Sequence, residues 1–135
     1  MFDCVWPTRT ARFGNAITAR GVLNLRNAVF SDDFGPIEEG CQCTCCRPAT
    51  DGGLAITRAY VYHVTAKETA GAHLLTMHNV HYQLDLMRRA REAIIEDRYP
   101  QFVGEFFSQL YAGDKEKYPK WAVNALRDVG LDLLA

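Results

Sequence analysis

Four thiols lie within six positions in the segment CQCTCC, residues 41–46. A secreted disulfide framework spreads its cysteines to join distant segments, which thiols this close together cannot do. One metal ion suits them better, because thiolates and imidazoles are the usual ligands of structural zinc. Adjacent Cys45 and Cys46 would be strained if both pointed at one ion. The pattern therefore favours three thiols from this segment and one histidine from elsewhere, and a redox-active thiol group is the alternative.

Four histidines could supply the remaining ligand, namely His63, His73, His78 and His81. His78 and His81 lie three positions apart and share a face of the helix that we expect there. Spacing alone does not choose among the four.

The cysteine segment lies in an expected loop, residues 31–53, that is interrupted by glycines and prolines and carries several carboxylates. Upstream, residues 2–6 look like the end of a buried strand that Pro7 stops, and two short extended pieces follow at 16–18 and 22–25. Downstream, the apolar spacing predicts helices. Their expected ranges are 55–67 with an end near Gly71, 72–97, 101–112, and a helix that begins at Pro119 and ends before Gly130.

The composition indicates a folded protein without a general affinity for nucleic acid. The chain has 135 residues, 48% of them hydrophobic, and a net charge of −1. The stretch from Cys4 to Ser31 is different, because it holds four arginines and no acidic residue. These are Arg9, Arg12, Arg20 and Arg26. A phosphate-facing surface would explain them, and ordinary surface arginines are the alternative.

No apolar run approaches the roughly 20 residues of a membrane helix, and the start of the chain has no signal-peptide pattern. We therefore expect no membrane insertion and a reducing compartment, most simply the cytoplasm.

Asp3 lies at the end of the expected strand, where a barrel enzyme places catalytic groups, although most aspartates near turns are caps or solvated. The surrounding segment FDCVWPTRTAR, residues 2–12, resembles the active-site segment of queuine tRNA-ribosyltransferases, the tRNA-guanine transglycosylases. So does LRNA, residues 25–28, with Phe30 after it. The Cys-x-Cys-x2-Cys spacing and the later His-Asn pair resemble the zinc site of that family. The resemblance extends as far as the helix around residues 101–111.

The resemblance implies roles for particular residues. Asp3 matches the nucleophile. The segment that recognises the wobble nucleotide and its neighbours matches Thr8, Arg9, Thr10, Ala11 and Arg12. One structural zinc ion is implied, with the ligands Cys41, Cys43, Cys46 and His78. Cys45 is then spare, and His81 is a helix-surface or packing residue. The sequence departs from the family at Thr10, where relatives carry another small polar residue, and in a longer spacer around residues 49–57.

The implied fold is α/β, the C-terminal part of a TIM-type (β/α)8 barrel with an inserted zinc-binding subdomain and C-terminal helices. A complete barrel needs about 250 residues. We accordingly expect residues 1–30 to end the barrel, residues 31–98 to form the zinc-binding subdomain, and residues 99–135 to form the terminal helices.

The implied activity is exchange of guanine at the tRNA anticodon wobble position for queuine, through a covalent aspartyl-ribosyl intermediate. Asp3 indicates the catalytic type, since the accessory subunit of the family lacks the nucleophile. The expected partners are the tRNA anticodon loop, queuine or a related deazaguanine base, and a second subunit in a dimer, either identical or the accessory subunit. The alternative is a noncatalytic zinc-binding module, or a truncated subunit, that docks to a partner subunit or to tRNA.

Overall fold

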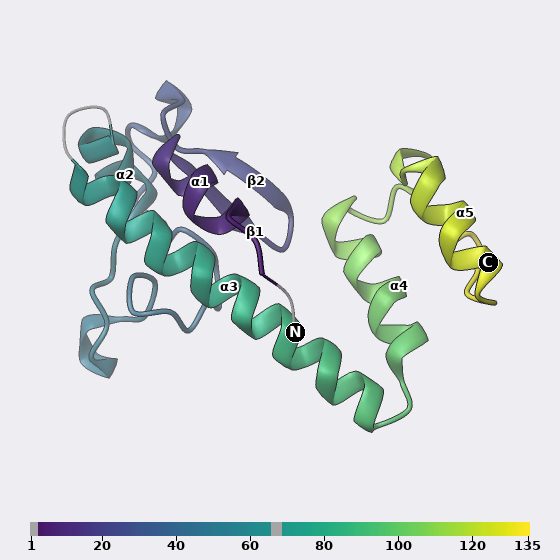
Figure 1. Ribbon diagram of the computed structural model, residues 1–135. Helices are drawn as coiled ribbons and strands as arrows, with labels where there is room; N and C mark the ends of the chain where they lie inside the picture. The colour runs from purple at the N-terminus through teal and green to yellow at the C-terminus, as the bar shows by residue number, and fades with distance from the viewer. Residues whose placement is uncertain (1–2, 66–68) are drawn as a thin grey trace. The chain divides into compact units, whose positions relative to one another are not determined.

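The computed structural model describes residues 3–65 and 69–135, and the chain forms two compact units. The first unit comprises Met1–Thr18 and Val22–Leu86, and the second comprises Ala19–Gly21 and Met87–Ala135. The longest described helix, α3 (Thr69–Ile95), contributes residues to both units, which divide between Leu86 and Met87 (Figure 1).

The first described element is a helix, where the sequence predicts the end of a strand. Helix α1 is Trp6–Arg12, and Pro7 lies in its first turn, where a missing N–H costs no hydrogen bond. Val5 and Trp6 are 60% and 44% exposed, so the prediction that residues 5 and 6 belong to a buried strand is wrong. Residue 2, which the same prediction included, lies outside the described residues. A proline after two apolar residues reads equally well as a strand end and as a helix start.

The two short extended pieces are confirmed. Strands β1 (Asn15–Thr18) and β2 (Gly21–Asn24) form a two-stranded sheet, and α1 packs against β1. Gly14 makes the turn from α1 into β1 with a positive φ of 78°, a conformation that favours glycine. Over the residues that the structure describes, the fold is a mixture of helices and this one small sheet, and no barrel forms within it.

Helix α2 is Arg58–Thr65, and it starts later than the predicted residue 55. Ala55 has a positive φ of 49°, which no α-helix contains. The predicted end at Gly71 is also wrong, because Gly71 lies inside α3. A Cβ on Gly71 would lie 2.8 Å from Thr65 Cγ2, so this glycine allows a close approach instead of ending a helix. Predicted helical residues 66 and 67 lie outside the described residues.

The core of the first unit surrounds the cysteine segment. Its buried members come from α1, the hairpin, the loop, α2 and α3. They include Ala11, Ala16, Leu25, Ile37, Val61 and Leu75, together with Cys43, Cys45 and Cys46. Short 3-10 turns, η1 (Ala28–Phe30) and η2 (Ala49–Asp51), shape the loop on either side of the cysteines. The metal-binding segment is therefore part of the hydrophobic core.

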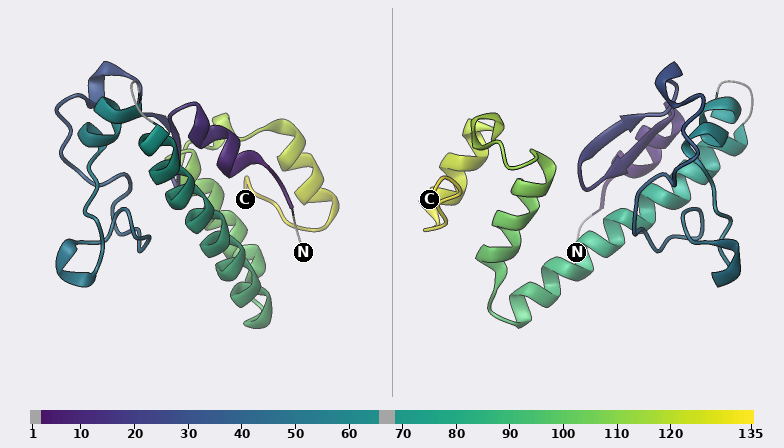
Figure 2. Two further views of the ribbon diagram at one scale, coloured as in Figure 1. Left: turned by 60° about the vertical axis from the view of Figure 1, so that its left-hand side comes forward. Right: turned by 180° about the vertical axis from the view of Figure 1, so that it is seen from behind.

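The second unit has its own aromatic core. Helix α4 is Tyr99–Leu110, η3 is Lys115–Lys117, and α5 is Lys120–Asp128. The rings of Phe107 and Tyr111 each lie 5.4 Å from the ring of Tyr118. Both predicted helices are present. Pro119, however, is the residue before α5 and not its first helical residue. The two helices are seen from further sides in Figure 2.

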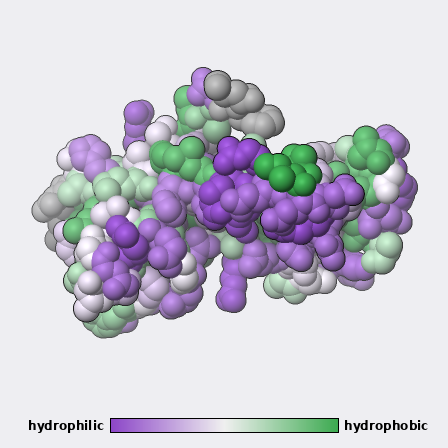
Figure 3. All heavy atoms as spheres, turned by 90° about the horizontal axis from the view of Figure 1, so that it is seen from below, coloured by the Kyte–Doolittle hydropathy of each residue, from purple (hydrophilic) through white to green (hydrophobic). Residues whose placement is uncertain are grey.

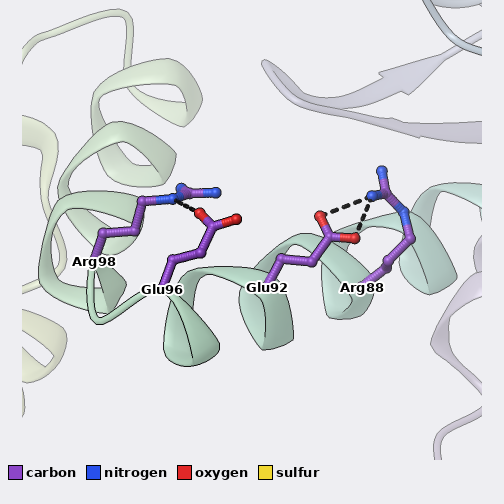
Figure 4. A network of polar contacts seen from close by, with 4 residues as sticks. All are labelled: Arg88, Glu92, Glu96 and Arg98. Atoms are coloured by element: carbon purple, nitrogen blue, oxygen red, sulfur yellow. Dashed lines mark hydrogen bonds and ion pairs between the residues drawn. The ribbon is translucent and has the colours of Figure 1, made fainter.

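Ion pairs line the end of α3 and the turn after it (Figure 4). Arg88 Nη1 contacts Glu92 at 2.8 Å one helical turn away, and Arg98 pairs with Glu96. Exposed pairs of this kind contribute little to stability.

Hydrophobic side chains form separate groups on a largely hydrophilic face in Figure 3. Among the described residues, no helix combines the length and the apolar character needed to cross a membrane.

Candidate metal centre

Three cysteines and one histidine converge beside helix α3. The ligand atoms of Cys41, Cys43, Cys46 and His78 all lie within 4.8 Å of one another. Cys43 and Cys46 are buried, His78 is fully buried, and Cys41 is half-buried. All five cysteines of the chain are free thiols. The convergence of three thiols on an imidazole favours a metal site over the redox alternative.

The distances match tetrahedral coordination of zinc. His78 Nδ1 lies 3.5 Å from Cys43 Sγ, 3.5 Å from Cys46 Sγ and 3.7 Å from Cys41 Sγ. Around a tetrahedral ion, Zn–S and Zn–N bonds of about 2.3 and 2.0–2.1 Å place sulfur and nitrogen about 3.6 Å apart. The donor set and its spacing thus fit one zinc ion. Because four protein ligands fill the coordination sphere, the ion is structural.

Backbone hydrogen bonds set the shape of the cysteine loop. The amides of Cys46 and Arg47 both donate to Cys43 O, at 3.2 and 3.0 Å, which closes a tight turn. The Cys46 amide also lies 3.3 Å from Cys43 Sγ, as a donor to that sulfur. On the outer side, Leu54 N donates to Thr44 O and Ile56 N to Cys45 O, both at 2.8 Å. The end of the spacer at residues 49–57 therefore braces the loop that holds the metal ligands.

The Cys45 thiol is not one of the four clustered ligand atoms. Its Sγ donates to Leu74 O on α3 at 3.3 Å, and the residue is fully buried. The neighbouring Cys43 thiol, together with burial, raises the pKa of the Cys45 thiol, which keeps its proton for this bond. The argument that adjacent Cys45 and Cys46 would not share one ion agrees with this geometry. The hydrogen bond from Cys45 to Leu74 O therefore holds the cysteine loop against α3.

The electrostatics of the cluster favour a cation. Hydrogen bonds from Cys41, and then from Cys45 and Cys46, lower the pKa of the Cys43 thiol and favour its thiolate. The interactions with Cys41 and Cys43 raise the pKa of Cys46. Burial lowers the pKa of His78, but the thiols of Cys41 and Cys43 outweigh it and raise that pKa to about 10. Protons and a metal ion therefore compete for the same atoms.

The two polar residues of α3 at this point, His78 and Asn79, are both fully buried and hydrogen-bonded. His78 Nε2 lies 2.9 Å from Ile17 O, so Nε2 carries the proton and Nδ1 is left to face the thiols. Asn79 Oδ1 accepts from Ile17 N at 2.8 Å, and its Nδ2 donates to Pro7 O and Asn15 O, both at 3.0 Å. The sequence pointed to the His-Asn pair without indicating any role for Asn79.

The remaining histidines lie outside this cluster. His63 Nε2 is 3.3 Å from Ser31 O, His73 is exposed, and His81 is half-buried on α3. The choice of His78, which spacing had left open, therefore agrees with the geometry of the site.

The residues expected to act on RNA lie in and before α1. Asp3 is exposed and precedes the helix, and Thr8, Arg9 and Arg12 are exposed on it. The other two members of the segment face inward. The Thr10 hydroxyl donates to Trp6 O at 2.6 Å, and the Ala11 side chain is fully buried in the core. Side-chain contacts with an RNA are thus open to three of the five residues.

The chain is similar in sequence to one family of known proteins. The chain matches the family described as "Queuine tRNA-ribosyltransferase" over residues 1–112. Over its full length it is 61% identical to the queuine tRNA-ribosyltransferase catalytic subunit of Schizosaccharomyces pombe, and over 98% of its length it is 39% identical to that of Caenorhabditis elegans. It is 48% identical over 110 residues, or 81% of its length, to the queuine tRNA-ribosyltransferase of Bacillus subtilis. The chain spans 33%, 35% and 27% of these three relatives.

Proposed function

The chain belongs to the queuine tRNA-ribosyltransferase family, and on that premise we propose that it is the C-terminal part of a tRNA-guanine transglycosylase. Such an enzyme exchanges guanine at the anticodon wobble position for queuine. The observation that carries the proposal is an exposed, arginine-bearing helix, preceded by an exposed Asp3, that Asn79 joins to the helix bearing the ligand His78. In this proposal residues 1–30 end a (β/α)8 barrel, residues 31–98 form the zinc-binding subdomain, and residues 99–135 form the terminal helices.

Asp3 acts as the nucleophile in the proposed reaction. Its carboxylate attacks C1′ of the wobble ribose, and the bond from C1′ to guanine breaks with its electron pair leaving on guanine, which takes up a proton. Queuine then loses a proton and attacks C1′, which releases the carboxylate. Two displacements through a covalent intermediate replace one harder step. The exposure of Asp3 supports this role, because the carboxylate is open to a nucleotide.

The exposed face of α1 binds the anticodon loop in this proposal. Thr8, Arg9 and Arg12 contact phosphates or base edges of the unstacked loop, which is where proteins generally read RNA. The absence of acidic residues from Cys4 to Ser31 supports a phosphate-facing surface. Thr10 and Ala11 contribute from the inner face of α1, where they hold the helix in place.

The proposed partners follow from the same resemblance. The incoming base is queuine or a related deazaguanine, and the enzyme is a dimer, either of identical subunits or with a noncatalytic accessory subunit. The designation of two relatives as a catalytic subunit supports a second subunit. We place the enzyme in the cytoplasm, where thiols stay reduced and available to zinc.

The test compares this chain alone with a chimera, in which the chain replaces its matching segment of the S. pombe catalytic subunit. Each protein is incubated with tRNA and labelled guanine. We expect incorporation by the chimera and its loss in Asp3→Asn, with Glu39→Gln, another exposed carboxylate, as the control that stays active.

The chain spans one third of the length of its S. pombe relative, which supports a second candidate function. In this alternative the chain is a noncatalytic zinc-binding module that docks to tRNA or to a partner subunit. A chimera that binds zinc and tRNA but incorporates no guanine would overturn the enzyme proposal in favour of the module.

A further inference from the structure

Asn79 uses both ends of its buried amide to join segments that are far apart in sequence. Its oxygen accepts from Ile17 N in β1 at 2.8 Å. Its nitrogen donates to Pro7 O in α1 and to Asn15 O in β1, both at 3.0 Å, and lies 3.3 Å from Thr10 Oγ1. These partners lie 62 to 72 positions away along the chain. An amide that is fully buried and fully bonded specifies one arrangement of the elements around it.

The metal ligand and Asn79 hold the same residue of β1. His78 Nε2 bonds to the oxygen of Ile17, while Asn79 bonds to its nitrogen. The two side chains are consecutive on α3, so their spacing is fixed by the helix backbone. A zinc ion bound at Nδ1 would hold the His78 ring, and the ring would then hold β1 on α3 through Ile17 O.

We propose that Asn79 is a positioning residue for RNA recognition. It holds α1, and with it the exposed side chains of Thr8, Arg9 and Arg12, at a set position on the metal-bearing helix α3. The inference rests on the proposed function, because only then does the outer face of α1 meet an anticodon loop. Asn79 itself is fully buried and touches no RNA.

The chemistry of the amide makes the proposal specific. An aspartate has the size of asparagine and could still accept from Ile17 N. It would, however, place a carboxylate oxygen against the carbonyl oxygens of Pro7 and Asn15, where an N–H now donates. Asn79→Asp should therefore loosen α1 while it leaves the cysteines, the histidine and the apolar core unchanged. Asn79→Ala removes all of these bonds at once.

The experiment compares zinc-loaded wild type with Asn79→Asp and Asn79→Ala. Asn124→Asp, on the exposed side of α5, is the matched control for charge. Val61→Ala in α2 is the control for lost stability, because Val61 is fully buried and apolar. The readouts are zinc per chain, amide hydrogen exchange in residues 8–17, and affinity for an anticodon stem-loop RNA with guanosine at the wobble position, measured across a salt series.

For both Asn79 variants we expect retained zinc, exchange in residues 8–17 faster by about tenfold or more, and RNA binding weaker by about tenfold. The dependence of affinity on salt should also flatten, because displaced arginines make fewer phosphate contacts. A loss of stability alone, as in Val61→Ala, would leave that salt dependence unchanged.

Unchanged exchange in residues 8–17 in zinc-loaded Asn79→Asp would overturn the inference, as would equal weakening and equal flattening in Val61→Ala. If wild type does not bind the RNA, the RNA-binding part of the proposed function fails. The exchange data then still decide whether Asn79 holds α1. The two failures are therefore distinguishable.

Discussion

Chelation of the zinc ion should unfold the first unit and leave the second folded. Two ligands, Cys43 and Cys46, are members of the first unit's hydrophobic core, and His78 is fully buried beside them. A structural zinc site contributes about 10–16 kcal/mol of binding free energy, whereas a whole domain is stable by only about 5–15 kcal/mol. Removal of the ion is thus expected to cancel the stability of this unit. The aromatic core around Tyr118 contains none of the four ligands.

Hydrogen exchange measured segment by segment checks this expectation. Residues 31–65 and 69–86 should lose their protection when a strong chelator is added, and residues 99–128 should keep it. Added zinc should restore the original pattern. Unchanged protection in residues 31–86 after complete removal of zinc would refute the reasoning.

Two adjacent cysteines supply a matched control for the same experiment. Cys46→Ser removes a ligand and should reproduce the effect of chelation. Cys45→Ser should bind one zinc ion per chain and keep the protected pattern, because a serine hydroxyl can still donate to Leu74 O. Equal zinc loss in both variants would contradict the assignment of the ligands.

Three further predictions concern the loop and helix α4. Arg58 Nη1 lies 3.0 Å from Asp33 Oδ2, and this hydrogen bond, followed by one from the Gly35 amide, lowers the pKa of Asp33. The stabilisation is therefore present above the unfolded pKa of about 3.9 and is lost as pH falls through the lower folded value. Urea unfolding at pH 6 and pH 3 should show a larger difference between wild type and Asp33→Asn at the higher pH, of less than about 1 kcal/mol there. A Cβ on Gly53 would lie 2.1 Å from the Arg47 carbonyl oxygen, so Gly53→Ala should destabilise by at least about 2 kcal/mol and weaken zinc binding. Gly104 lies in α4 with open space around it, and Gly104→Ala should instead stabilise by about 0.5–1 kcal/mol in thermal unfolding.

The metal centre could be predicted further than most of the fold. The closeness of the thiols indicated a metal, and the strain between neighbours indicated that one thiol would be left over. The family resemblance predicts His78 as the ligand, because helical spacing does not distinguish His78 from His81. The geometry of the cluster agrees with both inferences.

The parts that the sequence did not predict depend on contacts between distant residues. A proline after residues 5 and 6 is compatible with the end of a strand and with the start of a helix, and from the sequence we expect the strand. The structure has the helix, α1, which packs on β1. Gly71 read as a helix end, whereas it is the point where α3 passes close to Thr65. Asn79 gave no signal of its own, since all its partners lie more than 60 positions away. Periodicity within a helix contains no information about such partners.

The bonds to Ile17 also bear on the solubility of the protein. A two-stranded sheet leaves open edges on which a strand from another molecule can add. At Ile17 the backbone N–H and C=O of β1 are hydrogen-bonded to the side chains of Asn79 and His78. These two side chains of α3 therefore occupy positions where a third strand would pair. That protection depends on the ion that orients the imidazole. Zinc-depleted protein, in which the first unit unfolds, should therefore self-associate, because the N–H and C=O of Ile17 are then open to pairing with another chain.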